Sequence, residues 1–419
     1  MNKRRVALVL IVCGLGGFVF AEEPAPPLTW ADCVAIALGQ NPDLASSREG
    51  RAASAANYRG SFNGLMPGVN LSNSYNDSKG ADAALWQAQL TANLTVFDAS
   101  TYAGIKSASA SLNQAEARQR QASAQLRLEL RRAFLRRLFD DKDIAVSRNV
   151  EEIRRKSAQL VTLRYQSGRE SKGNKLRAEA QLLEAAAESA QARRRVRSDQ
   201  RVLYRQLGLA EVDNRPVQGA LDAAEPPDLP SEMRGIVDQR PDVLLQMAGQ
   251  KIAQANVDQA RSSLWPTLSA GYSNFRSGES EFPSDNSGWT VRGVLDYPLF
   301  AGGPTAAANA ITASRRNLEK AKQDLRAVRD QAMAELETAW AAYAAAADQT
   351  RVQSALLSAA RQRNDEADVR YNSGLLTYDN WEIIVTDRVN QERQTIQAHL
   401  TAATAQTVWE NALGITLEE

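Results

Sequence analysis

The second half of the chain repeats the first at a nearly constant spacing. The segments NPDL at Asn41–Leu44 and RPDV at Arg240–Val243 lie 199 residues apart, and RYQSG at Arg164–Gly168 and RYNSG at Arg370–Gly374 lie 206 apart. The two copies therefore differ by only a few inserted residues. A duplication of this size indicates one supersecondary unit used twice, so the content of one copy predicts the architecture of both.

Each copy contains two stretches in which apolar and polar residues alternate. In the clearest stretch, Trp86–Val96, apolar residues fall on one side and Gln, Thr and Asn on the other. A period of two residues is typical of a β-strand, so we predict β-hairpins at residues 67–97 and 266–300. Each strand has about ten residues, the length that a tilted strand needs to cross a bilayer. An ordinary soluble sheet with one buried face is the alternative.

Aromatic residues gather near the ends of these strands. Such residues favour the boundary between lipid and water, so we expect them to form two membrane girdles. One group lies toward the hairpin turns (Tyr75, Trp86, Phe275 and Trp289) and the other toward the helices (Phe97, Trp265, Tyr297 and Phe300).

A very long helix is predicted after each hairpin. Residues 101–167 and 305–373 contain no proline, and return helices are expected at 173–207 and 379–413. At 1.5 Å per residue, each long helix would span about 100 Å. A helix of that length needs neighbours along its side, because an exposed apolar stripe would not stay solvated.

The predicted domain order follows from the repeat. Repeat one covers 22–208 and begins with a helix interrupted at Asn41-Pro42; repeat two covers 231–414. A proline-rich linker at 209–230 joins them, and 415–419 form a short tail.

Residues 1–21 have the pattern of a secretory signal peptide. Lysine and arginines at 3–5 precede an apolar run at 6–20, and Ala21 supplies the small residue that cleavage needs. A lipoprotein anchored through Cys13 is the alternative. After cleavage only Cys33 would remain, so no disulfide can form within the chain, and we expect Cys33 to be a small buried side chain.

Composition gives little support to catalysis or nucleic-acid binding. The chain has 50 Lys and Arg against 49 Asp and Glu, a balance that argues against a nucleic-acid partner. His399 is the only histidine, and the sequence has no paired-cysteine motif or glycine-rich phosphate loop. We therefore expect no enzyme activity, no cofactor and no metal. The Arg-rich stretches 131–137 and 193–197 are interpreted as solvated helix faces paired with acids on neighbouring helices.

Four strands in one chain are too few to close a barrel. Open strand edges are not tolerated within lipid, so strands of several chains must be pooled. A dimer would give eight strands and a filled interior, whereas a trimer would give twelve and room for a lumen. The polar face of Gln, Thr and Asn favours the trimer.

The chain resembles the TolC family of outer-membrane efflux and secretion channels. The resemblance rests on LTWADCVAIALGQNPDL at 28–44, LWPTLSAGYS at 264–273, DYPLFAGG at 296–303 and RYNSGLLTYDN at 370–380. Arg240–Val243 is especially similar to members that serve resistance-nodulation-division pumps. The implied fold is α+β: long antiparallel helical hairpins forming an α-barrel across the periplasm, and a trimeric twelve-stranded β-barrel among the lipids of the outer membrane.

The resemblance also implies a function. The chain would be the passive exit duct of a tripartite efflux system, bound to a periplasmic adaptor and through it to an inner-membrane pump. A channel for type I protein secretion is one alternative, and a non-conducting periplasmic coiled-coil scaffold is another.

The turns between long and return helices are the predicted adaptor contacts. The family's turn, Arg-Tyr-x-x-Gly-Leu followed by Ser or Thr, is matched in repeat two and less fully in repeat one, where Arg169 replaces Leu. The implied contact residues are Arg164, Tyr165, Gly168, Ser171, Arg370, Tyr371, Gly374, Leu375 and Thr377. Alternatively, both glycines simply permit a left-handed turn.

A pore constriction is implied just past the second turn. Members of the family often carry Asp six residues after the turn glycine, and this chain has Asn380 there, with Ile383 at a second such position. Asp379 and Glu382 are nearby acids that could substitute, although acids at a helix start are also ordinary caps. The predicted constriction is therefore Asp379, Asn380, Glu382 and Ile383.

Overall fold

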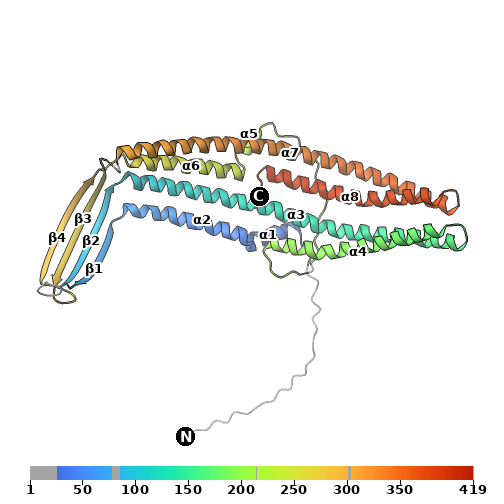
Figure 1. The fold of residues 1–419 in the computed structure, drawn as a ribbon, viewed down its shortest axis with the longest axis horizontal. Coiled ribbons are helices and arrows are strands. Elements are labelled where there is room, and N and C mark those ends of the chain that lie inside the picture. The colour runs from blue at the N-terminus through green and yellow to red at the C-terminus, as the bar shows by residue number, and fades with distance from the viewer. Residues whose placement is uncertain (1–25, 78–84, 214, 301–302, 419) are drawn as a thin grey trace, which may run out of the picture.

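The chain is an elongated bundle of helices with a β-sheet at one end and two helical turns at the other (Figure 1). This computed structural model describes residues 26–77, 85–213, 215–300 and 303–418. The predicted signal peptide, Cys13 and most of the first hairpin turn lie outside the described residues.

The elements follow the same order in both halves: one helix or two, two strands, a long helix and a return helix. The first half contains α1 Trp30–Gln40, α2 Pro42–Gly60, the 3-10 turn η1 Ser61–Leu65, β1 Gly68–Asn76, β2 Leu85–Phe97, α3 Ala99–Gln166 and α4 Lys172–Leu207. The second contains α5 Met233–Val237, α6 Pro241–Ser262, β3 Thr267–Gly278, β4 Asn286–Asp296, α7 Pro304–Asn372 and α8 Tyr378–Ala412. The last strand ends at Asp296, so Tyr297 and Phe300 lie beyond it, because Pro298 has no N–H for a ladder hydrogen bond.

Helix ends are set by capping side chains and glycines. Asp98 accepts a hydrogen bond from the Ser100 N–H at 2.8 Å to start α3, and Ser171 accepts one from Asn174 at 3.1 Å to start α4. Gly168, Gly208, Gly374 and Gly414 all have positive φ, and they follow the long and return helices of each copy. The αL conformation at these four positions stops each helix.

The sheet is antiparallel, in the order β1-β2-β3-β4. Tyr75 pairs with Trp86, Ala92 with Tyr272 and Tyr272 with Val291. Apolar side chains such as Leu71 and Val291 are exposed, so the described helices leave this face uncovered. Neither face of the sheet is buried by the described chain, so the alternative of an ordinary soluble sheet with one buried face is wrong. The outer edges of β1 and β4 are open within the described residues.

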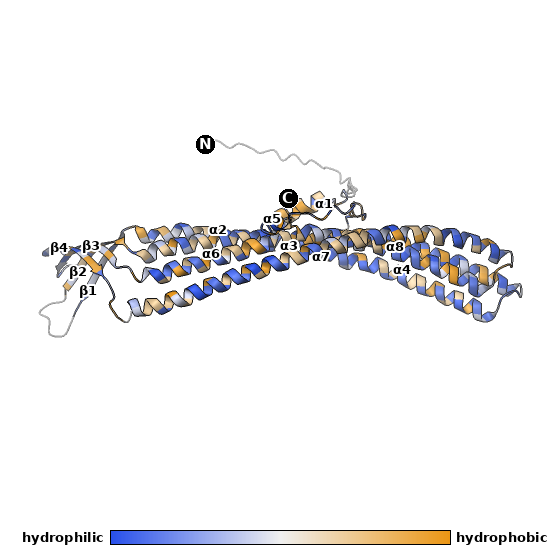
Figure 2. Ribbon diagram, turned by 90° about the horizontal axis from the view of Figure 1, so that it is seen from above, coloured by the Kyte–Doolittle hydropathy of each residue, from blue (hydrophilic) through white to orange (hydrophobic). Residues whose placement is uncertain are grey.

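Two apolar clusters lie near the middle of the bundle, where α1 and α5 stand off the long helices (Figure 2). One includes Cys33, Leu130 and Leu207; the other includes Leu336 and Trp409. Cys33 is fully buried as predicted, and burial raises the pKa of its thiol to about 11.

The proline-rich linker is packed rather than free. Val217 forms a parallel bridge with Leu28, and Leu221 is fully buried in the first cluster. On the other side of the bundle the Tyr343 hydroxyl donates to the Ala224 carbonyl at 2.6 Å. The linker therefore contacts both copies near the middle of the bundle.

No helix in the described ranges combines the length and the apolar character needed to cross a bilayer.

Candidate functional site

The NPD segment of repeat one is a joint between α2 and the end of α4. Asn41 donates from Nδ2 to the Gln206 carbonyl at 2.9 Å, and its Oδ1 accepts from the N–H of Leu44 at 3.0 Å. Gly208 has φ +81°, and a Cβ there would lie 2.2 Å from the Gln40 carbonyl oxygen. Only glycine fits this approach of two backbones.

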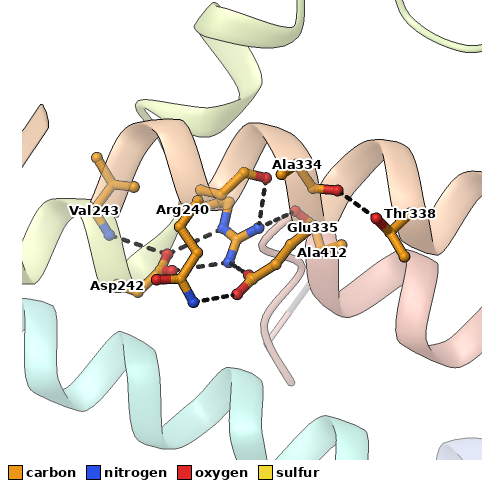
Figure 3. Close-up of polar contacts among 9 residues, drawn as sticks. Arg240, Asp242, Val243, Ala334, Glu335, Thr338 and Ala412 are labelled. Atoms are coloured by element: carbon orange, nitrogen blue, oxygen red, sulfur yellow. Dashed lines mark hydrogen bonds and ion pairs between the residues drawn. The ribbon is translucent and has the colours of Figure 1, made fainter. Parts of the chain in front are cut away.

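The RPD segment of repeat two forms the matching joint. Arg240 is buried and its Nη2 pairs with Asp242 at 2.8 Å and Glu335 at 2.7 Å (Figure 3). Its Nη1 also donates to the Ala412 carbonyl at 3.4 Å, and Ala412 stands 206 residues after Gln206. Burial alone would lower the pKa of Arg240, but hydrogen bonds to Asp242 and Glu335 raise it. The repeated motif therefore marks equivalent contacts with the end of each return helix.

The two predicted tips lie side by side at the end of the bundle opposite the sheet (Figure 1). Gly168 and Gly374 have φ of +72° and +77°. Both turns contain the same hydrogen bond, from the residue after the glycine to the arginine five residues earlier. The Arg169 N–H donates to the Arg164 carbonyl at 2.8 Å, and the Leu375 N–H donates to the Arg370 carbonyl at 2.9 Å. Leu375 projects into solvent.

Side chains tie the two tips together. Arg164 donates to the Tyr371 carbonyl at 2.5 Å, and its guanidinium lies 4.3 Å from the centre of the Tyr371 ring. The Tyr371 hydroxyl donates to Glu170 at 3.0 Å, and its ring stacks on Trp381 at 4.5 Å. Sequence reasoning placed Arg164 and Tyr371 here but missed Glu170 and Trp381.

The protonation states of Tyr371 and Glu170 strengthen the hydrogen bond between them. Burial, helped by the Glu170 carboxylate, raises the pKa of Tyr371, so its hydroxyl remains a donor. Burial would raise the pKa of Glu170, but hydrogen bonds from Asn174, Ser171 and Tyr371 lower it instead. Glu170 is therefore a charged acceptor at neutral pH.

The repeat-one tip is more polar, as the sequence predicted. Tyr165, the equivalent of Tyr371, is partly exposed. Lys175 occupies the position equivalent to Trp381, with Nζ 5.5 Å from the Tyr165 ring centre. Ser171 caps α4, whereas Arg370 and Thr377 are exposed.

The predicted constriction residues separate into two groups. Asp379, Asn380 and Ile383 are exposed on the first turns of α8. Glu382 is buried instead, with its Oε1 2.9 Å from Arg154 Nη1 and 2.7 Å from Gln181 Nε2. The prediction that Glu382 faces a pore conflicts with this burial, because Arg154 holds the carboxylate between α3, α4 and α8.

The Arg-rich stretches confirm the sequence prediction only in part: some arginines pair with acids on neighbouring helices, whereas Arg137 is buried and pairs with Asp141 on its own helix. Arg136 lies 3.1 Å from Asp199, and Arg195 pairs with Asp143. His399 Nδ1 lies 2.9 Å from Asp222. The described residues contain no group of His, Cys, Asp or Glu that could hold a metal ion.

The predicted girdle aromatics lie in two groups at opposite ends of the sheet. Tyr75 and Trp86 are 5.1 Å apart between ring centres at the hairpin end, and Phe97 and Trp265 are 6.3 Å apart at the helix end. Trp289 on the edge strand is in register with Asn274 and Leu90 and therefore lies on the same face as Trp86. Phe275 pairs with Gln89 and lies on the opposite, polar face, so its place in the predicted girdle is wrong. Trp265, Trp289, Tyr297 and Phe300 are exposed.

The fold is similar to those of solved outer-membrane proteins, two of which are described as channels. VceC of Vibrio cholerae is 17% identical, with a TM-score of 0.80 over 92% of this chain and 96% of that one. CmeC of Campylobacter jejuni is 15% identical, with a TM-score of 0.81 over 99% and 95%. The open-state MtrE channel of Neisseria gonorrhoeae is 18% identical, with a TM-score of 0.78 over 91% and 88%.

Two segments of the sequence match one family. No curated protein sequence matches the chain. The model of the outer membrane efflux protein family, however, matches residues 34–209 and 235–414, which together take in nearly all of both repeats. The chain therefore belongs to the outer membrane efflux protein family.

Proposed function

We propose that this protein is the trimeric exit duct of a tripartite efflux system. Three chains would pool their strands into a twelve-stranded barrel in the outer membrane, and their helices would continue the tube through the periplasm. The tips would contact a periplasmic adaptor, which links the duct to an inner-membrane pump. No substrate would be transformed.

The observation that carries this proposal is the uncovered sheet. Its apolar face and its two open edges are left unsatisfied by the described chain, although strand edges left open promote further pairing. Pairing β4 of one copy with β1 of the next satisfies both edges in a closed ring. The exposed aromatics at both ends of the sheet fit the two surfaces of a bilayer.

Efflux is favoured over type I protein secretion by the similarity of Arg240–Val243 to pump-serving members of the family. The contacts by which Arg240 anchors α6 to α7 and α8 are a structural role that does not depend on the class of transporter. The non-conducting scaffold is disfavoured by the exposed apolar face of the sheet.

Purified trimers are expected to form stable aqueous pores in a planar bilayer. Asn380→Asp should add a ring of three carboxylates around the symmetry axis. Millimolar divalent cations should therefore reduce the conductance of the variant more than that of the unmodified protein. Asn372→Asp adds the same charge on the other side of the turn and serves as the control. Folded trimers without any conductance would refute the duct, and equal cation block of both variants would refute the position of the constriction.

A photo-crosslinking residue at position 375 is expected to capture the adaptor in cells. Leu375 is exposed at the tip, and the buried core of a protein interface is more apolar than the surrounding surface. Position 169 should react more weakly, because the repeat-one tip around it is more polar. Thr312, exposed near the opposite end of α7, is the control. Equal capture from 312 and 375, read by mass spectrometry of the conjugates, would contradict tip docking.

A further inference from the structure

The apolar face of the sheet carries one charged residue within the described strands, Arg276 on β3. Arg276 is in register with Ala88 on β2, which lies two residues from Trp86 and therefore on the same face. The other described strand residues on this face are apolar, small or uncharged. The charged residues Arg292 and Asp296 of β4 lie on the opposite face. Arg276 is therefore a lone cation on a surface that the proposed barrel turns toward lipid.

The Arg276 guanidinium is exposed and has no ion pair within the described part of the chain. The turn between β3 and β4 contains acids, but its contacts lie elsewhere. Asp285 lies against Gly278, where an added Cβ would be 2.2 Å from its carboxylate oxygen, and Asn73 Nδ2 donates to the Glu281 carbonyl at 2.8 Å. A charge in apolar surroundings is costly unless it is paired, so Arg276 is suited to an anion supplied from outside the chain.

Two tryptophans place Arg276 at the level of a membrane surface. Trp86 is in register with Gly278, two residues toward the hairpin turn, and Trp289 with Asn274, two residues toward the helices. Tryptophan favours the boundary between lipid and water, so Arg276 lies within that boundary. The hairpin turns point away from the long helices (Figure 1), which puts this boundary on the outer side of the proposed barrel. An arginine at this level extends its charge toward the headgroups while its stem stays among apolar groups.

The rows of residues around Arg276 match the polarity of a lipid. Asn73, Ala88 and Arg276 form one row across β1, β2 and β3, in which Ala88 adds little bulk between a polar side chain and a cation. In the next row toward the helices, Leu71 and Leu90 are 80% and 40% exposed. Arg276 therefore stands where the face changes from apolar to polar, as a lipid changes between its acyl chains and its headgroup.

We propose that Arg276 binds a phosphate group in the headgroup of an anionic lipid at the outer surface of the membrane, with the acyl chains along Leu71 and Leu90. A guanidinium binds two phosphate oxygens at once, and net negative charge on the headgroup adds attraction. This inference rests on the proposed barrel, because membrane insertion is what brings lipid to this face. The trimer would carry three such sites, which would fix the depth of the barrel at its outer end.

Binding of lipid A to the purified full-length trimer in detergent tests the site. Lipid A carries phosphates on a glycolipid headgroup, and native mass spectrometry counts the molecules that each trimer retains. Arg276→Gln should weaken lipid A binding about fivefold, the contribution of one cation near an anionic lipid surface. Arg276→Lys keeps the charge without the two-pronged geometry and should lose less. Arg292→Gln removes an arginine from the opposite face and should bind lipid A as the unmodified protein does.

Two further probes separate the sources of phosphate. Dephosphorylated lipid A should bind the unmodified protein as weakly as lipid A binds Arg276→Gln, and inorganic phosphate at equal concentration should not displace lipid A. Displacement by inorganic phosphate would show a site for the free anion and overturn the assignment to a lipid.

The variants also separate this site from the proposed duct. Equal lipid A binding by Arg276→Gln and the unmodified protein, in trimers that conduct, would overturn the site while the duct stands. Loss of binding in Arg292→Gln alone would show that the other face of the sheet meets the lipid. Preparations that contain only non-conducting monomers would contradict both proposals.

Discussion

Gly208→Ala is expected to prevent most of the protein from reaching its folded state. The added Cβ would lie 2.2 Å from the Gln40 carbonyl oxygen and 2.8 Å from the Asn41 Cα, and both are backbone atoms. Alanine at positive φ also costs about 1–2 kcal/mol. With displacement of α2 from the end of α4, the total should reach about 4–5 kcal/mol, at the upper end for a point mutation.

Two other glycines provide the controls for this effect. Gly168 has a similar φ, but a Cβ added there would meet no described neighbour within 4 Å, so Gly168→Ala should cost only about 1–2 kcal/mol. Gly414→Ala should be intermediate, since its nearest contact is the Arg240 Cα at 3.2 Å. Thermal unfolding followed by circular dichroism, together with folded yield, should show the largest loss of stability at Gly208, an intermediate loss at Gly414 and the smallest at Gly168. An equal loss of stability at Gly168 and Gly208 would show that the positive φ alone, and not the close backbone contact at Gly208, sets the cost.

Arg154→Ala is expected to be the most damaging single change of a charged residue near the tips. Arg154 and Glu382 are both buried, and Gln181 and Thr386 add hydrogen bonds to the pair. Removing one partner of a buried ion pair costs about 3–5 kcal/mol, because the other charge is left unpaired. The unfolding midpoint should fall accordingly.

The repeat itself supplies the rescue variant. Arg154→Ala combined with Glu382→Leu reproduces the side chains at the equivalent positions 360 and 176. A buried pair replaced by apolar side chains is often tolerated, so the double variant should recover most of the loss. Arg155→Ala is the control, because Arg155 pairs with Glu151 and Glu152 at the surface and should change stability by less than about 1 kcal/mol. A double variant as unstable as Arg154→Ala would show that alanine and leucine cannot replace the buried ion pair.

Local patterns in the sequence predicted much of the fold. The period of two residues in Trp86–Val96 identified a strand, and the absence of proline between 305 and 373 identified a long helix. Both signals depend only on near neighbours in the chain. The polar character of the first tip was also visible, since Arg169 interrupts a local motif.

Contacts between distant segments were less accessible to sequence analysis. Glu382 has the sequence context of an exposed helix-start acid, but Arg154, 228 residues earlier, places it in the interior. Glu170 carries no local signal of its role, which depends on Tyr371 lying within hydrogen-bonding distance. The sequence repeat shows only that α3 corresponds to α7 and α4 to α8. It does not show which side chains of different helices meet.

The difference between equivalent positions has a consequence for how such a tube can evolve. In a ring of six identical single-repeat chains, one substitution would alter every contact between neighbours at once. Fusion of two copies removes this constraint, because the two halves of one chain can diverge: Arg154 and Glu382 form an ion pair at 2.9 Å, while the equivalent positions 360 and 176 carry alanine and leucine. A fused gene can therefore change the contacts within each chain of the proposed ring independently of the contacts between chains.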